Sequence, residues 1–589
     1  MSEHTKNKVE ISPEQMAEIE RFAREMTRLH NGEIDEDDFR RFRLENGIYG
    51  IRGSDDLQMI RVKIHWGGLN ADQLDTCADI AEKYADPKVA HVTTRQNLQF
   101  HRIARKNVPA AMKMMAECGL TSREACGNTV RTVTACPFAG IASEEPFDVT
   151  PYADATAKYF LRNPLAQNMP RKFKIAFEGC KTDHARIGIH DAGVQAVVRE
   201  VDGKAVRGFK IYVGGGLGAV PFPAVLLEEF TPADLLIPTL EAIIRLQDRH
   251  GNRKDKSQAR LKFLIHKTWG LEEFQKQFEA ERKQVIGMSP GHRLWHVEPT
   301  EQVPPPKPKL KESFALPGPG FEQWAKSNVV AQKQKGYKTV VIRCPLGDLS
   351  IEQMRGIAKV SREVCGGRIR ASITQNLLLT WVSEETLVPL YQALVKLKIA
   401  LPGGHELIDI TRCPGSDTCN LAITRSRTLA EGITKLFTNG GRPLIENEAL
   451  KKLTIKISGC PNSCGHHHIA DLGFHGAARK IEGRVVPHYH ILIGGGTTEQ
   501  KASMGIRIGQ VPAKRVPEVT QHLLELYRDG RQNTESMRDW VERITPAKLT
   551  ESIKPFTTLP SYDEEPEMYG DLGVEGEFKL EIGQGECAA

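Results

Sequence analysis

Apolar and polar positions recur along the chain with two different periods, and the two halves repeat the same order of periods. A period of two is typical of a strand, whereas apolar residues three and four positions apart mark one face of a helix. In the first half the pattern predicts a strand, a helix, a strand and a helix over residues 58–65, 71–84, 89–102 and 108–118. This order is typical of a small α+β sandwich.

A second part of each half begins at a cysteine and carries further runs of β-branched and aromatic residues. We expect strands over residues 172–177, 207–213, 453–457 and 488–493, and helices within 232–285 and 512–543. Residues after about 556 are acidic and Gly-rich, and we expect them to be extended or mobile. The predicted fold class is therefore mixed α/β.

The chain is predicted to be an internal duplication. Shifting the sequence against itself by 277 to 280 residues aligns Gly68–Leu74 with Asp348–Met354, Arg95–Leu98 with Thr374–Leu377, Thr134–Pro137 with Thr411–Pro414, Phe177–Cys180 with Ile457–Cys460, and Val213–Gly216 with Ile493–Gly496. Five matches at nearly one offset indicate an old repeat. The Pro-rich stretches Gln302–Lys309 and Leu316–Gly320 predict an extended connection between the halves.

Composition narrows the class of protein. The 589 residues are 40% hydrophobic, which allows several domains that each have a core. No 18-residue apolar stretch occurs and the N-terminus lacks an apolar signal region, so we expect neither export nor a membrane span. Eight of the twelve cysteines are scattered along the chain, which is unlike a disulfide framework and suits a reducing cytoplasm. The net charge of +6 favours an anionic ligand or acidic partner over nucleic acid.

Two cysteine pairs in the second half predict a metal centre. Cys413 and Cys419 are separated by five residues, and Cys460 and Cys464 by three, within turn-like sequence. Thiolates bind zinc or an iron-sulfur cluster, and zinc knuckles usually have closer pairs than the first of these. The spacing therefore favours iron-sulfur, with buried, inert thiols as the alternative.

The two halves differ at matched positions. Cys136 and Cys180 align with Cys413 and Cys460, but Ala142 and His184 replace the other two thiols, so we assign the cluster to the second half. Conversely, four basic residues of the first half align with uncharged residues of the second half. They are Arg61, Arg95, Arg131 and Lys174, which align in this order with Val341, Thr374, Ile408 and Thr454. Lys172 and Lys174 would point to one face of a strand. An anion site is therefore predicted in the first half.

These residues resemble the sirohaem-dependent sulfite and nitrite reductases over about residues 45–545, most closely the ferredoxin-type sulfite reductases. The match rests on the two cysteine pairs, Thr94–Asn97, Pro170–Lys174 and the duplication. The resemblance implies a 4Fe-4S cluster on Cys413, Cys419, Cys460 and Cys464, the last also bridging to sirohaem. It places the substrate anion among Arg61, Arg131, Lys172 and Lys174, and the macrocycle against Thr93, Arg95, Gln99 and His101.

The same resemblance implies the domain organisation. We expect two ferredoxin-like half-domains and two larger α/β domains that bind sirohaem and cluster, related by a pseudo-twofold axis. The expected segments are an N-terminal helical extension at 1–45, half-domains at 46–120 and 323–402, a sirohaem and substrate domain at 121–300, a Pro-rich linker at 301–322, a cluster domain at 403–550 and a tail at 551–589.

The implied reaction is the six-electron reduction of sulfite to sulfide, with nitrite reduction to ammonium as the alternative. Ferredoxin-type nitrite reductases tend to carry Asn where this chain has Lys174, which favours sulfite. Some sulfite-reducing members have a Tyr–Cys covalent link near the haem, and the matching residues are Tyr49 and Cys126. Ordinary packing of these two residues is the alternative interpretation.

No flavin or nicotinamide domain is recognisable, so the electrons should come from an acidic ferredoxin or a flavoprotein reductase. Two distant alternatives are a non-catalytic iron-sulfur protein and a sirohaem-free relative such as the cobalamin-pathway oxygenases. The Gly-rich turns at Gly214–Gly216 and Gly494–Gly496 lack the dinucleotide spacing. His466–His468 and Cys587 have no assigned role.

Overall fold

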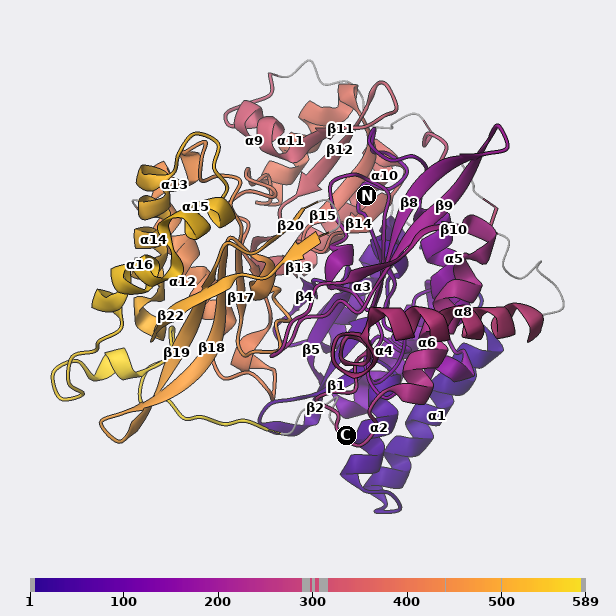
Figure 1. Cartoon of the computed structure of the whole chain (residues 1–589), viewed down its shortest axis with the longest axis horizontal. Helices are drawn as coiled ribbons and strands as arrows, with labels where there is room; N and C mark the ends of the chain where they lie inside the picture. Colours follow the sequence, from indigo (N-terminus) through magenta and orange to yellow (C-terminus); the bar gives the residue numbers. More distant parts are fainter. Residues whose placement is uncertain are drawn as a thin grey trace.

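We describe the protein from a computed structural model that covers residues 6–288, 297–298, 302–306, 316–439, 441–498 and 501–583. The described residues form four five-stranded sheets and one two-stranded ribbon, β20 (Gly496–Thr498) with β21 (Lys501–Ser503). In Figure 1 the large sheet of the first half lies on the right and that of the second half on the left. No described helix is long and apolar enough to cross a bilayer.

Two of the sheets belong to small half-domains that exchange a strand. The first sheet has the order β1-β2-β5-β4-β13, with strands Ile48–Ile51, Ser54–Val62, Leu98–Ala104, Val89–Val92 and Asp348–Ser350. The second has the order β11-β12-β15-β14-β3, with strands Val329–Ala331, Tyr337–Ile342, Leu377–Ser383, Arg368–Ala371 and Gly68–Asn70. Each half therefore donates one strand to the sheet of the other half, as a twofold relation requires.

The helices of the two half-domains follow the same symmetry. They are α3 (Ala71–Tyr84), α4 (Val108–Glu117), α10 (Ile351–Cys365) and α11 (Leu387–Lys396). Helices α3 and α10 both begin with a capping box, formed by Asn70 with Gln73 and by Ser350 with Gln353. The two half-domains share one hydrophobic core, which fixes their relative position.

Each half also contains a large domain whose sheet is parallel on one side and antiparallel on the other. The first sheet has the order β10-β9-β8-β7-β6, with strands Val225–Pro232, Lys204–Val213, Ala192–Val201, Ile175–Glu178 and Thr134–Ala135. The second has the order β16-β17-β18-β19-β22, with strands Thr411–Arg412, Ile455–Ser458, Leu472–Ile481, Arg484–Ile493 and Ile506–Pro512. The strands at the cysteines are parallel in both halves.

Helices cover each large sheet and complete a separate core for each domain. In the first half these helices are α5 (Thr150–Phe160), α6 (Leu236–His250), α7 (Leu261–Phe263) and α8 (Gly270–Met288). In the second half they are α12 (Ser426–Thr438), α13 (Arg442–Glu446), α14 (Val516–Gly530), α15 (Met537–Ile544) and α16 (Pro546–Ser552). Helix α9 (Phe321–Asn328) precedes the second half-domain.

The two ends of the chain pack against this framework. Helices α1 (Pro13–His30) and α2 (Glu36–Glu45) pack on the first half-domain through buried Phe22 and Phe39. The tail that was expected to be extended or mobile has little regular structure, but it contacts the second large domain: Tyr569 is buried, Asp571 accepts a hydrogen bond from the backbone of Arg425, and the backbone N–H of Gly583 donates to the carbonyl of Asn420. Cys587 lies outside the described residues.

Most expected elements are present, but two predictions were wrong. The single strand expected over residues 89–102 is two strands, β4 and β5, separated by a tight turn at Thr93–Asn97. The strand expected from residue 172 begins only at Ile175, so Lys172 and Lys174 precede β7 instead of sharing a strand face. Mixed α/β class and duplication are confirmed by the paired sheet orders. The exact domain boundaries stay predictions.

Candidate active site

The two cysteine pairs of the second half meet at one edge of its large sheet. Cys413 directly follows β16, and Cys460 lies two residues after the parallel neighbour β17. Because parallel strands end at the same edge, these turns are adjacent. Cys413 and Cys460 are buried, Cys419 is half-buried and Cys464 is exposed. The edge therefore presents four sulfur atoms, one of them from the surface side.

The spacing of the four thiols suits a cluster better than a single ion. Burial and then neighbouring cysteines raise the pKa of Cys413, and the same causes raise that of Cys419 to about 12, so the sulfur atoms interact electrostatically. A single tetrahedral zinc needs sulfur atoms roughly 3.8 Å apart. Among the described residues, the one group of three or more ligand atoms within 4.8 Å of one another lies elsewhere. The donor set thus fits a larger, thiolate-bound iron-sulfur cluster.

The turns that carry the cysteines are fixed by close backbone packing. The backbone N–H of Cys413 donates to the carbonyl of Ile457, and that of Gly459 donates to the Cys413 sulfur at 3.2 Å. A Cβ on Gly465 would lie 1.9 Å from the same Ile457 carbonyl oxygen. Only glycine fits at position 465, directly after Cys464. The close contact of Gly465 with the strand therefore fixes the position of Cys464, the last of the four cysteines.

The Thr94–Asn97 motif of the first half reaches the cysteine turn of the second. The Thr94 hydroxyl donates to the backbone carbonyl of Cys464 at 2.9 Å. Gln96 is fully buried with φ of 57°, and its amide donates to the carbonyls of Ala135 and Ala371. The motif is therefore a structural turn that joins a half-domain to both halves of the molecule.

The second half contains the symmetric copy of this turn. Gln375 has φ of 66°, and its amide donates to the carbonyl of Val92 and accepts from the backbone of Arg412, the residue before Cys413. Two buried glutamines thus hold the strand ends that carry the cysteines. The sequence repeat aligned these residues without indicating their role.

Arg61 and Arg131 converge on one carbonyl group beside the cysteine predicted for the covalent link. Both guanidinium groups donate to the carbonyl oxygen of Ala125 at 3.2 Å, directly before Cys126. Arg131 also contacts the Tyr49 hydroxyl at 3.4 Å, and the Arg61 guanidinium lies 5.2 Å from the centre of the Tyr49 ring. Tyr49, Cys126 and the two arginines therefore belong to one neighbourhood.

Lys174 belongs to the same cationic group. Burial, followed by the nearby charges of Arg95 and Arg260, lowers the pKa of Lys174 well below its usual range, and Lys172 acts in the same direction. Cys464 contributes in the opposite direction. A cluster of partly buried cations is an arrangement that an anion stabilises.

The four residues expected at the macrocycle lie around the same turn. Arg95 donates to His190 at 2.8 Å and to the carbonyl of Thr132, and burial followed by Arg131 lowers its pKa to about 9. The Thr93 hydroxyl accepts from the backbone of Arg95 at 3.2 Å. Gln99, with its amide oxygen turned toward Arg61, accepts from Nε at 2.9 Å.

Two buried nitrogen atoms of this set fit a bound cofactor. Among the described residues, neither Nε of Arg95 nor Nδ1 of His101 has a hydrogen-bond partner. Burial, and then His91, lowers the pKa of His101 to about 3, so the ring is neutral. Buried polar atoms of this kind normally have partners. An anionic tetrapyrrole beside the turn would provide them.

Sequence reasoning missed the residues that position Lys174. Asp191 accepts from the backbone N–H of Lys174 at 2.9 Å and forms an ion pair with Arg260 at 2.6 Å. His190, the residue before Asp191, forms a hydrogen bond with Arg95. The only indication in the sequence was the alignment of Asp191 with Asp471. Asp471 likewise accepts a hydrogen bond from the backbone N–H of Thr454, the residue that aligns with Lys174.

Comparisons with known proteins identify the architecture. The family model described as "Nitrite and sulphite reductase 4Fe-4S domain" matches residues 126–286 and 403–557. A second, described as "Nitrite/Sulfite reductase ferredoxin-like half domain", matches residues 51–118 and 330–397. Each model matches once in each half, in agreement with the paired sheets.

Known relatives match over most of the chain. An assimilatory ferredoxin-dependent nitrite reductase of Haloferax mediterranei is 27% identical and 88% of each chain is covered. Sulfite reductase [ferredoxin] 1 of Mycolicibacterium paratuberculosis is 25% identical with 83% of each covered. The solved structure of Mycobacterium tuberculosis NirA protein has a TM-score of 0.74 at 26% identity, covering 88% of this chain and 92% of that one.

The first of the two family models alone covers more than half of the chain, and its two matches include all four clustered cysteines. The protein therefore belongs to the nitrite and sulphite reductase 4Fe-4S family, and it is a nitrite or sulfite reductase of the type that uses sirohaem and a 4Fe-4S cluster.

Proposed function

We propose that the protein reduces sulfite to sulfide. The observation that carries the proposal is the position of Lys174, whose backbone is held by Asp191 beside Arg260 and whose pKa is lowered by burial and by the charges of Arg95, Arg260 and Lys172. Sulfite has three oxygen atoms and a higher charge than nitrite, so an additional ammonium group favours sulfite electrostatically. Reduction of sulfur from +4 to −2 requires six electrons, and sirohaem joined to the cluster supplies them one at a time when bound.

Residues of this chain have separate tasks in the proposed site. Cys413, Cys419, Cys460 and Cys464 would hold the cluster, with Cys464 also facing the sirohaem iron. Thr93, Arg95, Gln99 and His101 would contact the macrocycle. These assignments agree with the neutral His101 ring and with the unpaired Nε of Arg95.

The basic residues would bind the oxyanion and supply protons. Arg61 and Arg131 share the Ala125 carbonyl, which orients both planar guanidinium groups toward one place, and such groups favour forked hydrogen bonds to oxyanions. Lys172 and Lys174 would donate protons to the oxygen atoms that leave as water. The lowered pKa of Lys174 makes its ammonium group a stronger acid than a lysine in water.

Tyr49 and Cys126 are proposed to form the covalent link found in some sulfite-reducing members. The contact of Arg131 with both the Tyr49 hydroxyl and the carbonyl before Cys126 supports this proposal. Formation of the link is a two-electron oxidation in which an oxidant such as dioxygen accepts the two hydrogens, so peptide mass mapping would detect a linked pair as a loss of two hydrogens. Separate, unmodified peptides in the active enzyme would reject it.

An external ferredoxin is the proposed electron donor, because the names of the Haloferax and Mycolicibacterium relatives specify ferredoxin. An acidic ferredoxin would be attracted to a chain with a net charge of +6. A flavoprotein reductase is the alternative. Binding of reduced ferredoxin that weakens with rising salt would support the first donor, and salt-independent turnover with a flavoprotein alone would support the second.

Nitrite reduction is the second candidate, because nitrite reductases are prominent among the similar proteins. A product assay separates the two. The cofactor-loaded enzyme is supplied with reduced ferredoxin and either sulfite or nitrite, and sulfide and ammonium are measured against the ferredoxin oxidised. Our proposal requires one sulfide for six electrons; ammonium from nitrite without sulfide from sulfite would reject it.

A further inference from the structure

The first half has a second group of metal-binding side chains, at the position that the duplication relates to the cluster. Cys136 directly follows β6, and Cys180 lies two residues after the parallel neighbour β7. The backbone of Cys136 donates to the carbonyl of Phe177, as Cys413 does to Ile457 in the second half. The fold therefore presents two cysteines at each equivalent sheet edge.

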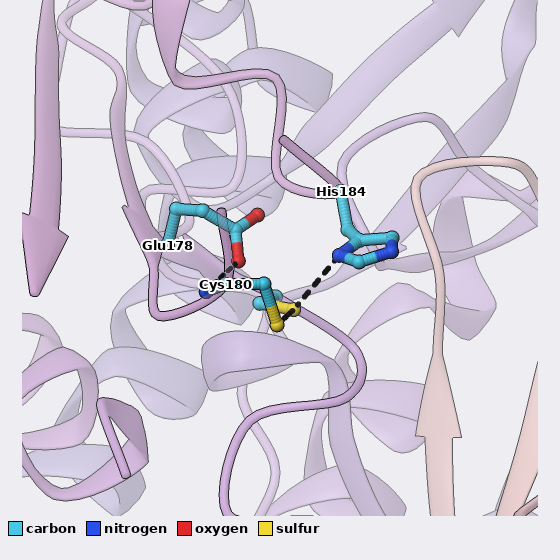
Figure 2. Close-up of side chains that lie close together, drawn as sticks. Glu178, Cys180 and His184 are labelled. Carbon is cyan, nitrogen blue, oxygen red and sulfur yellow. Dashed lines mark hydrogen bonds between the residues drawn. The ribbon is translucent and has the colours of Figure 1, made fainter. Parts of the chain in front are cut away.

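The remaining ligands of the two edges differ in chemistry. His184 occupies the position of the exposed cluster cysteine, and Glu178 at the end of β7 approaches from the strand itself. Figure 2 shows the side chain of Glu178, at the end of β7, close to those of Cys180 and His184 from the loop that follows. The ligand atoms of these three residues and of Cys136 all lie within 4.8 Å of one another.

The distances match those of a single tetrahedral ion. The Cys136 and Cys180 sulfur atoms are 3.8 Å apart, and the Cys136 sulfur lies 3.6 Å from Nδ1 of His184. Zinc bound to sulfur at about 2.3 Å and to nitrogen at about 2.0 Å in a tetrahedron separates two sulfur atoms by roughly 3.8 Å and a sulfur and a nitrogen by roughly 3.5 Å. The group is too compact for a cluster and has only two thiols.

The surroundings hold these side chains in a binding arrangement. The Glu178 carboxylate accepts from the backbone N–H groups of Gly179 and Cys180 at 2.9 Å and of Ala185 at 2.8 Å. The ring of Phe138 packs edge-on against the His184 ring with centroids 4.9 Å apart. Glu178 and both cysteines are buried, whereas His184 is half-buried and leaves a route from the surface.

We propose that Cys136, Cys180 and His184 bind one zinc ion, with Glu178 as the fourth ligand. The two thiols and the Glu178 carboxyl group lose their protons to solvent as the ion binds, so three anionic ligands and one neutral imidazole leave the bound site with a net charge of −1. With four protein ligands the site is closed and structural. It would hold together the C-terminal ends of β6 and β7; β7 begins directly after Lys174, and β6 begins three residues after Arg131. The inference does not depend on which oxyanion is reduced.

The test is the metal content of the cofactor-loaded protein, because a protein without its cluster could bind zinc at Cys413 and its partners instead. The enzyme is purified without oxygen, dialysed against a chelator, and analysed for zinc and iron in one sample. We expect about one zinc per chain at full iron content. His184→Ala should lose the zinc and keep the iron, whereas the matched control Cys344→Ser, at a buried cysteine outside the group, should keep both.

A second variant keeps the test decisive if His184→Ala folds poorly. His184→Cys supplies a third thiolate, so it should still bind one zinc, and replacing zinc with Co²⁺ should give stronger thiolate-to-cobalt absorption than in the natural protein. Iron-loaded protein that takes up neither Zn²⁺ nor Co²⁺ would overturn the proposal. A Cys136–Cys180 disulfide in the isolated protein that persists under reducing expression conditions, or zinc retained equally by His184→Ala, would also overturn it.

Discussion

Replacing Lys174 by glutamine isolates the charge that our substrate assignment depends on. Glutamine keeps most of the length of the side chain and can still donate a hydrogen bond, but it carries no charge and no transferable proton. The backbone N–H of residue 174 donates to Asp191 in either case, so the turn should be retained. The exposed Lys204 on β9 provides a matched Lys→Gln control far from the site.

The expected loss follows from two effects. A hydrogen bond to a charged group contributes about 1.5–3 kcal/mol, and each 1.4 kcal/mol is a factor of ten, so loss of binding alone lowers kcat/KM by roughly 10- to 150-fold. If Lys174 also donates a proton, removal of this general acid lowers the rate by a further factor of about 10² to 10⁴. We therefore expect a loss of at least about 10²-fold with sulfite and a smaller loss with nitrite.

The pH profile distinguishes a catalytic acid from a simple positioning charge. Burial and then Arg95 lower the pKa of Lys174, so the free enzyme should lose kcat/KM as pH rises through this lowered value, below the usual lysine range. A bound anion favours the ammonium form, so the same limb in kcat should lie at higher pH. Lys174→Gln should lack this limb.

The assay uses one reduced ferredoxin, with iron and sirohaem content measured in every variant. Lys204→Gln should match the natural enzyme at every pH. The reasoning is refuted if Lys174→Gln, with full cofactor content, keeps kcat/KM for sulfite within threefold and retains the alkaline limb. A tenfold loss of kcat/KM that is equal for sulfite and nitrite would agree with an anion site at Lys174 but would reject a role of Lys174 in selectivity.

Further predictions concern the framework of the site. Gly465→Ala should lose cluster iron because its Cβ would meet a strand carbonyl at 1.9 Å, whereas Gly496→Ala, with no atom within 4 Å, should keep it. Lys63→Met should leave the buried Glu124 carboxylate without its 3.1 Å partner and cost about 3–5 kcal/mol, seen as a lower unfolding temperature that Glu124→Gln partly restores. Asp348→Asn should lower stability most near pH 7 and progressively less as pH falls from about 4 to 2, and an equal loss at pH 7 and pH 2 would reject the ion-pair account.

The sign of the Asp348 prediction follows from its neighbours. Burial alone would raise its pKa, but Arg412 at 2.7 Å and His91 at 2.8 Å lower it below the ordinary value. A carboxyl group whose pKa is depressed in the folded state contributes stability above its unfolded pKa, near 4. That contribution is lost as pH falls toward the folded value. Thermal unfolding between pH 7 and pH 2 measures it.

Features that depend on local sequence could be predicted well. Helix α3 lies at the predicted residues 71–84, because its apolar period and its Asn70 cap are both contained in the segment. The repeat also aligned Cys136 with Cys413 correctly, since both directly follow equivalent strands. Local sequence patterns and the internal repeat were therefore sufficient to predict these elements.

Features that depend on distant parts of the chain could not be predicted. Strands β3 and β13 pair across the two halves, and no local pattern indicates such an exchange. The turn within residues 89–102 forms because buried side chains of Gln96 and Asn97 bond to backbone groups of other segments, which compensates for the positive φ at Gln96. Lys174 lies outside its expected strand for a related reason, since its backbone N–H donates a hydrogen bond to the side chain of Asp191.

The central claim is that this family member selects sulfite, and the ratio of kcat/KM for sulfite to that for nitrite tests it most directly. Both values are measured on one cofactor-loaded preparation, with the same reduced low-potential donor. The account predicts a ratio clearly above one, with sulfide as the product. A ratio clearly below one would contradict the substrate assignment, while the fold, the cluster cysteines and the family would stand.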